Sequence, residues 1–226
     1  MLQKPGRHFL QIPGPTPLPE RVAQAISRST IDHRGPEFAQ LPLGIFERLR
    51  TVFGTTDPIA VYPSSASGAW EAALANTLSP GDRVLFCTSG QFAAQWSKVA
   101  TRFGLHVEEL VGDWRLRVDP DQVTTKLKTN PAIKAVALVH NETSTGVCNP
   151  LPEIARSVRD ASPETLILVD TVSGLGGAEL RFDEWGLDLA FAGTQKCLAL
   201  PPGLCVFAIS ERAIERASGM PDRGFM

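Results

Sequence analysis

Short apolar runs rich in β-branched residues alternate with stretches of helical apolar spacing from Ile59 onward. Strands that alternate with helices pair in parallel, and the helices then cover both faces of the sheet. Two runs, 135–139 and 166–169, are apolar throughout, as central strands of such a sheet are. We therefore expect an α/β fold with a seven-stranded, mostly parallel sheet flanked by helices. The expected strands are 59–62, 83–87, 105–110, 133–140, 165–170, 187–191 and 204–209, and the expected helices are 68–78, 92–103, 120–128, 151–161 and 211–217.

The first part of the chain differs in composition and is rich in proline and glycine. The Pro-Gly-Pro sequence at 13–15 confines the backbone to extended and turn conformations. Two helices are expected here, one starting near Pro19 and one over about 43–53. A length of 226 residues corresponds to between one and two domains of about 150 residues. We expect residues 1–58 to form an N-terminal arm and interface segment and residues 59–226 to form one large domain.

Charge and cysteine content narrow the choice of partners. The chain has 22 Lys and Arg against 24 Asp and Glu, a formal net charge of −2, which gives no attraction for nucleic acid or an anionic membrane. No apolar run approaches the roughly 18 residues of a membrane span. The cysteines lack the two-residue spacing of zinc or thioredoxin-like motifs, so no metal site is expected. These features favour a cytoplasmic protein without a nucleic acid or membrane partner.

Polar residues follow four of the expected strands. In sheets of this kind ligands bind beyond the carboxyl ends of the strands. The segments that follow those strands are 63–68, 141–146, 170–174 and 193–196, and they are rich in Ser, Thr, Asn, Asp and Lys. The sequence therefore predicts a ligand site at this edge of the sheet.

Three features of these segments have chemical meaning, and each also has a purely structural interpretation. Ser65, Ala66 and Ser67 precede a helix, whose first N–H groups bind anions, but a serine there also serves as a helix cap. Asp170 ends an apolar strand and needs a cationic or hydrogen-donating partner, or else caps a turn. Lys196 lies among apolar neighbours, where a lysine becomes nucleophilic, but most lysines are simply solvated.

The combination is more specific than its members. Pyridoxal phosphate requires a lysine for its covalent attachment, an aspartate for its ring nitrogen and hydrogen-bond donors for its phosphate. Asp170 and Lys196 lie at the ends of neighbouring expected strands, with the anion site earlier in the chain. Their order, spacing and strand positions together favour a pyridoxal phosphate site.

The sequence resembles the class V aminotransferases, a family of fold type I pyridoxal-phosphate enzymes, over essentially its whole length. Within the family it is most similar to serine–glyoxylate and alanine–glyoxylate aminotransferases. The resemblance is carried by seven motifs in order: Ile12-Pro13-Gly14-Pro15-Thr16, Asp32-His33-Arg34, Ser67 to Leu74, Leu78-Ser79-Pro80-Gly81-Asp82, His140 to Gly146, Asp183-Glu184-Trp185-Gly186 and Gly193-Thr194-Gln195-Lys196.

The resemblance implies catalytic roles for two residues. Lys196 would carry the cofactor and then move a proton between the substrate α-carbon and the cofactor, and Asp170 would keep the ring nitrogen protonated. It also implies further cofactor contacts, which are Ser65, Ala66, Ser67 and Gln195 at the phosphate, Val172 and Phe92 on the two faces of the ring, and Thr143 near the ring oxygen.

The sequence departs from the family pattern in two ways. Ala66 occupies a position where relatives commonly have glycine, which matters only if the turn requires a positive φ. The family's chains continue into a small C-terminal domain that is absent here, and the arginine that binds the substrate carboxylate is expected there, beyond residue 226. The resemblance also implies a homodimer with shared active sites, in the cytoplasm or, in a eukaryote, the peroxisome.

The expected function is transfer of an amino group from a small amino acid, namely serine, alanine or aspartate, to glyoxylate, giving glycine. The sequence does not choose among the three donors. Two alternatives stay open. One is another reaction of the same family, such as a cysteine desulfurase or a lyase, because the fold does not fix the chemistry. The other is a truncated domain that binds the cofactor without turnover.

Overall fold

The structure is a computed structural model that describes residues 10–220, so the ends of the two expected segments, 1–9 and 221–226, lie outside the described part. The helices are α1 (Glu20–Ile26), α2 (Pro36–Phe53), α3 (Ala66–Thr77), α4 (Gln91–Arg102), α5 (Pro120–Thr129), α6 (Leu151–Ala161) and α7 (Glu211–Ser218). The strands are β1 (Ile59–Ser64), β2 (Arg83–Thr88), β3 (His106–Val111), β4 (Ile133–Val139), β5 (Asn141–Glu142), β6 (Val147–Cys148), β7 (Leu166–Asp170), β8 (Leu189–Gly193) and β9 (Gly203–Ile209).

Seven strands form one sheet in the order β1-β9-β8-β7-β4-β2-β3. The strands β8, β7, β4, β2 and β3 pair in parallel, whereas β9 is antiparallel to both β8 and β1. The expected α/β class with a mostly parallel sheet is therefore confirmed. The short strands β5 and β6 form a separate antiparallel hairpin after β4, which the sequence did not predict.

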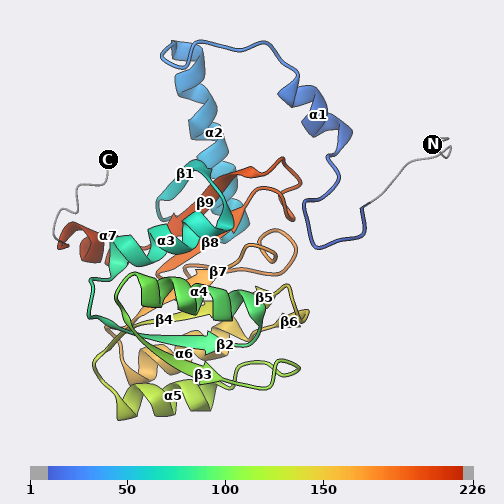
Figure 1. Cartoon of the computed structure of the whole chain (residues 1–226). Helices are drawn as coiled ribbons and strands as arrows, with labels where there is room; N and C mark the ends of the chain where they lie inside the picture. Colours follow the sequence, from blue (N-terminus) through green and yellow to red (C-terminus); the bar gives the residue numbers. More distant parts are fainter. Residues whose placement is uncertain (1–9, 221–226) are drawn as a thin grey trace.

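The helices cover the two faces of the sheet, with α3 and α4 on one face and α5 and α6 on the other (Figure 1). On the first face the buried ring of Trp96 meets Phe86 and Phe191 edge-on, at centroid distances of 5.4 and 5.3 Å. On the second face Val123 of α5 and Ile154 of α6 are fully buried. Burial of each large apolar side chain stabilises the fold by roughly 1.5–3 kcal/mol, so both layers hold their helices firmly on the sheet.

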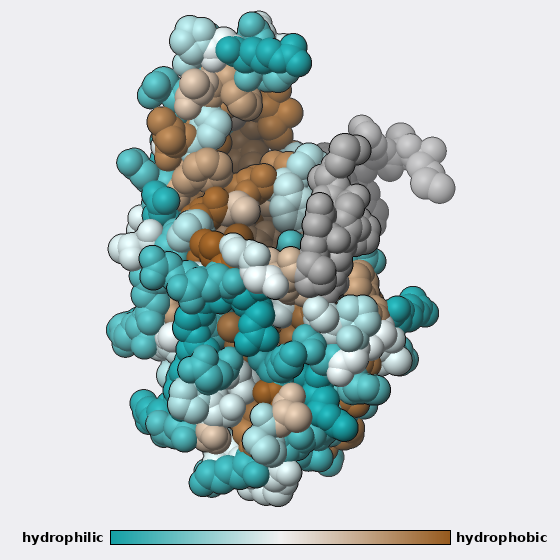
Figure 2. All heavy atoms as spheres, turned by 90° about the vertical axis from the view of Figure 1, so that its left-hand side faces the viewer, coloured by the Kyte–Doolittle hydropathy of each residue, from teal (hydrophilic) through white to brown (hydrophobic). Residues whose placement is uncertain are grey.

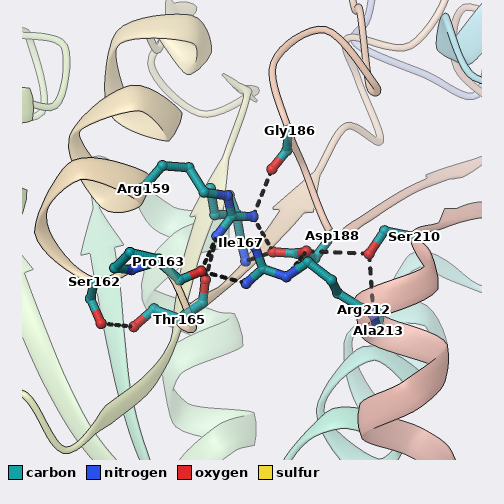
Figure 3. Close-up of polar contacts among 10 residues, drawn as sticks. All are labelled: Arg159, Ser162, Pro163, Thr165, Ile167, Gly186, Asp188, Ser210, Arg212 and Ala213. Atoms are coloured by element: carbon teal, nitrogen blue, oxygen red, sulfur yellow. Dashed lines mark hydrogen bonds and ion pairs between the residues drawn. The ribbon is translucent and has the colours of Figure 1, made fainter.

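An ion pair with a buried carboxylate joins the amino ends of the strands to the helices beside them (Figure 3). Asp188, just before β8, accepts hydrogen bonds from Nη2 of Arg159 at 2.6 Å and from the backbone N–H of Ile167 at 2.7 Å. It also pairs with Arg212 of α7 at 3.5 Å and accepts from the hydroxyl of Ser210. This network fixes α6, β7, β8 and α7 at the edge of the sheet opposite the expected ligand site.

Helix α2 begins earlier than the sequence predicts. The expected helix starts near residue 43, but the observed helix runs from Pro36 to Phe53 and contains Pro42 in its interior. An interior proline loses one helical hydrogen bond, so local propensity points to a later start. Pro36 at the first turn is favourable because its missing N–H would have no helical partner there.

Apolar side chains of α2 remain exposed. Leu41, Leu43 and Ile45 are 52%, 58% and 42% exposed. Figure 2 shows hydrophobic side chains gathered on the upper part of the molecule, where α2 lies, whereas the lower part is mostly hydrophilic. Within residues 10–220, none of the helices combines the length and the apolar character that a membrane crossing requires.

Candidate active site

A cavity of about 160 Å³ lies at the carboxyl edge of the sheet, beyond the ends of β4, β7 and β8. It is lined by Ala66, Ser67, Trp70, Phe92, Gln95, Val139, Thr143, Asp170, Val172, Gln195 and Lys196. Eight of the nine residues predicted to bind the cofactor are in this lining, and the exception is Ser65. Three wider cavities lie elsewhere in residues 10–220, one of them between α1 and α2, and these three lack this combination of a buried aspartate, a lysine and a helix N-terminus.

The turn that leads into α3 is capped by a serine and contains the first N–H groups of the helix. Ser65 is the N-cap of the helix, and its hydroxyl oxygen accepts a hydrogen bond from the N–H of Gly68 at 3.4 Å. Ala66 and Ser67 begin the helix, where the first N–H groups have no acceptor within the helix and the helix dipole is positive. Ala66 does not adopt a positive φ, so the alanine in place of glycine causes no strain. This turn can therefore bind an anion.

Asp170 is the last residue of β7 and is only 3% exposed. Its Oδ2 accepts a hydrogen bond from Nε1 of Trp70 at 2.6 Å, and its Oδ1 accepts one from the N–H of Val172 at 2.8 Å. Burial raises the pKa of Asp170 to about 6, although these two hydrogen bonds lower it. The carboxylate therefore has the donating partners that its burial requires.

Lys196 follows β8, the neighbour of β7, so the chain topology brings Asp170 and Lys196 to the same cavity. The lysine is half-buried, and its Nζ donates a hydrogen bond to the carbonyl oxygen of Pro13 at 2.6 Å. The N–H of Thr16 donates to the carbonyl of Gln195 at 3.0 Å. The N-terminal segment 13–16 thus lies against the lysine, a contact that the sequence did not predict.

Gly14 is required by this contact. Its φ of +111° is unfavourable for residues with a side chain, and a Cβ at this position would lie 2.5 Å from Cδ of Lys196. The lysine side chain therefore packs directly against the backbone of Gly14, where a Cβ would overlap it.

Two aromatic side chains form part of the cavity wall. Phe92, in the first turn of α4, lies 6.4 Å from Trp70 between ring centroids, with the rings tilted by 60°. Thr143 lies in the turn that joins β5 and β6, and Val172 follows Asp170. These three predicted contacts with the cofactor ring, Phe92, Thr143 and Val172, come together from three separate segments of the chain.

The sequence did not single out Trp70, Gln95 and Val139. Trp70 lies one helical turn after Ser67, and Gln95 lies one turn after Phe92, so helical spacing could have placed both on the same side as the predicted residues. Cys197, beside the lysine, is exposed and its Sγ lies 3.5 Å from the carbonyl of Ser173. In the described part of the chain, no group of three or more His, Cys, Asp or Glu side chains is arranged to hold a metal ion.

Solved aminotransferase structures have the same fold as this chain. An alanine–glyoxylate aminotransferase from Nostoc sp. superposes with a TM-score of 0.90 at 36% identity, over 98% of this chain and 58% of that chain. An aspartate aminotransferase of subgroup IV from Thermus thermophilus gives a TM-score of 0.88 at 33% identity, over 96% of this chain and 60% of that chain. The sheet and its helices are therefore the large domain of a fold type I aminotransferase.

The sequence comparisons narrow this class to one family. The family model described as aminotransferase class-V matches residues 8–226, and the chain belongs to this family. A serine–glyoxylate aminotransferase from Methylorubrum extorquens is 40% identical over 224 residues, which are 98% of this chain and 56% of the relative. The resemblance seen in the sequence is thus confirmed. The chain spans about half the length of the curated relatives it matches.

Proposed function

We propose that the cavity binds pyridoxal phosphate and that the chain is the cofactor-binding part of an enzyme that transfers an amino group from a small amino acid to glyoxylate, giving glycine. The observation that carries this proposal is the convergence of a buried aspartate, a half-buried lysine and the N-terminus of α3 on one cavity. Among the residues of that cavity, the three kinds of group that the cofactor needs are all present.

The residues present fit the cofactor. The N–H groups of Ala66 and Ser67 and the side chain of Gln195 would hold the phosphate, which a helix N-terminus favours. The buried carboxylate of Asp170 favours a cation beside it, and a protonated ring nitrogen supplies one. Phe92 and Val172 would contact the two faces of the ring.

When bound, pyridoxal phosphate accepts the electrons left on the substrate when its α-carbon loses a proton. The side chains of this protein would do the rest. Asp170 would hold the proton on the ring nitrogen through Oδ1 or Oδ2. Nζ of Lys196 would take the proton from the substrate α-carbon and pass it to the cofactor. Trp70 would keep the carboxylate of Asp170 oriented through its 2.6 Å hydrogen bond.

The substrate assignment rests on relatives. Proteins named serine–glyoxylate and L-aspartate–glyoxylate aminotransferase match this chain at about 40% identity, and all share glyoxylate in their names. We propose glyoxylate as acceptor and serine, alanine or aspartate as donor. None of the residues that line the cavity is an arginine, so the group that binds the substrate carboxylate would come from outside this lining.

A second copy of the chain is the proposed partner. Two exposed apolar side chains of α2, Leu41 and Ile45, support it, because they lie about one helical turn apart on the same side of the helix and apolar patches on a surface mark interaction sites. Sedimentation of the wild-type protein should give the mass of a dimer, and Leu41→Asp should shift it toward the monomer. A monomeric wild type would rule out this interface.

The cofactor claim is tested by trapping. The protein is saturated with pyridoxal phosphate, reduced with borohydride and weighed by mass spectrometry, which should show one covalent adduct located at Lys196. Lys196→Ala should lack the adduct, whereas Lys128→Ala, which removes an exposed lysine of α5, should keep it. Absence of the adduct in folded wild type would refute the proposal. Turnover of glyoxylate with each of the three donors then tests the substrates.

A further inference from the structure

Helix α4 lacks a cap of its own. Its N-cap residue is Gly90, and no side chain there bonds to the first turn. The N–H groups of that turn are instead bound by a segment about 50 residues later in the chain. The hydroxyl of Ser144 accepts from Gln91 at 3.0 Å, and the two carboxylate oxygens of Glu142 accept from Phe92 at 3.3 Å and from Ala93 at 3.1 Å.

The carboxylate of Glu142 is completely buried. Besides the two N–H groups of α4, it accepts hydrogen bonds from the N–H of Ser144 at 3.1 Å and from its hydroxyl at 2.7 Å. A buried carboxylate is costly to desolvate unless donors surround it. Here four donors and the positive end of α4 surround it, which is a built and fully satisfied arrangement.

Gly90 provides the space for this carboxylate. A Cβ at Gly90 would lie 2.2 Å from Cγ of Glu142. The φ of Gly90 is 170°, an extended conformation that any residue adopts, so the backbone itself does not demand glycine. The side chain of Glu142, and also Oγ of Ser144 at 2.8 Å, exclude a Cβ at this position.

The two segments that Glu142 joins both form walls of the candidate active site. The first two turns of α4 carry Phe92 and Gln95, and the turn after β5 carries Thr143. We propose that Glu142 is a positioning residue, whose buried carboxylate fixes Phe92 and Thr143 relative to each other and so sets the width of the cofactor cavity. This inference rests on the proposed function, because it concerns the same cavity.

Glu142 also acts on Asp170 through its charge. The charged groups that act on Asp170 are Glu142, which raises its pKa, and Lys196, which lowers it, in addition to the larger effect of burial. A role limited to holding the helix in place would leave the titration of Asp170 unchanged when the charge of Glu142 is removed. The titration therefore separates the two kinds of role.

The test compares Glu142→Ala, Glu142→Gln and Ser144→Ala with a matched control, Asp119→Ala, which removes the cap of α5 away from the cavity. Equilibrium affinity for pyridoxal phosphate is measured for each folded variant. We expect a loss of at least about tenfold in E142A, a smaller loss in E142Q, which keeps one acceptor oxygen, and a loss of several-fold in S144A. D119A should unfold at a lower temperature but bind within about twofold of wild type.

Two further measurements sharpen the test. Carboxyl-carbon NMR of aspartate-labelled, cofactor-free protein should show Asp170 titrating at lower pH in E142Q and at the wild-type pH in D119A. Gly90→Ala should weaken cofactor binding as E142A does, and in the double variant the two losses should add less than fully, because E142A removes the closest overlap with the new Cβ.

The outcomes separate the two proposals. A wild type that does not bind the cofactor refutes the proposed function. If the wild type binds the cofactor and E142A binds it as tightly, the role of Glu142 is refuted and the proposed function stands. The same conclusion follows if D119A loses as much affinity as E142A does. An unchanged Asp170 titration in E142Q refutes the effect of the Glu142 charge on Asp170. If E142A does not fold, the affinities of S144A and E142Q for pyridoxal phosphate test the role of Glu142 in its place.

Discussion

The buried carboxylate of Asp170 makes the stability of the cofactor-free protein depend on pH. Its pKa is raised from 3.8 to about 6 on folding, mainly by burial. Between these two values the folded protein holds a proton that the unfolded chain has released, so the free energy of unfolding falls as the pH rises through this range. The difference of about 2.2 pH units corresponds to about 3 kcal/mol, since each unit contributes about 1.4 kcal/mol. The stability that this residue contributes is fully present well below pH 3.8 and is lost as the pH rises through about 6.

A second buried group has the opposite effect over nearly the same range. Burial lowers the pKa of His140 from 6.5 to about 4. Here the unfolded chain binds the proton first, so stability rises with pH between about 4 and 6.5. The two residues nearly cancel, and the pH profile of the wild type alone does not reveal either of them. The measurement has to be a difference between the wild type and a variant.

The assay is urea unfolding of the cofactor-free wild type and Asp170→Asn at intervals from pH 4 to pH 8. The free energy of unfolding of the wild type, relative to the variant, should decrease by about 2.5 kcal/mol across this range, with its steepest change between pH 4 and 6, because the unfolded carboxyl is already partly ionised at pH 4. The same comparison with His140→Gln should give a change of opposite sign. Parallel profiles for the wild type and Asp170→Asn would refute the argument that Asp170 is desolvated in the folded protein.

Three other substitutions probe the contacts around the site and the core. Trp70→Phe removes one of the two donors to Asp170, and we expect urea unfolding at pH 8 to show a loss of about 1–3 kcal/mol, with a smaller loss at pH 4 where the carboxyl is protonated. Gly14→Ala should reduce the amount of borohydride-trapped cofactor at least about tenfold, because its Cβ would meet Lys196, and an unchanged yield would contradict the contact. Asp188→Asn breaks the buried network at the opposite edge and should cost about 3–5 kcal/mol in urea unfolding while the folded fraction binds cofactor normally.

The strands and the central pair of the site could be predicted from the sequence because their signals are local. A run that is apolar throughout is buried on both faces, and residues that follow parallel strands meet at one edge, which is why Asp170 and Lys196 were expected together. The contact of Lys196 with Pro13 has no such signal, because it joins segments far apart in the chain. The cap of α4 by Glu142 was missed for the same reason.

The start of α2 shows a second limit of prediction from local sequence. Local propensity disfavours a helix through Pro42, yet α2 continues through it, so other interactions along the helix outweigh one lost hydrogen bond. The hydrogen-bond partner of Asp170 was predicted only as a class. That a donor had to be present followed from burial, but its identity as Trp70 depended on how α3 lies against β7.

The contact between Pro13 and Lys196 also affects the order of events during folding. The two residues are 183 positions apart, so nearly the whole described chain must be synthesised before they can meet. The entropy lost on closing so long a loop is recovered only after the sheet between them has formed. The segment 13–16 leaves the ribosome long before Lys196, but we expect it to take its place only after the sheet has formed. In a newly synthesised chain the sheet would then fold before Lys196 makes its contact with Pro13.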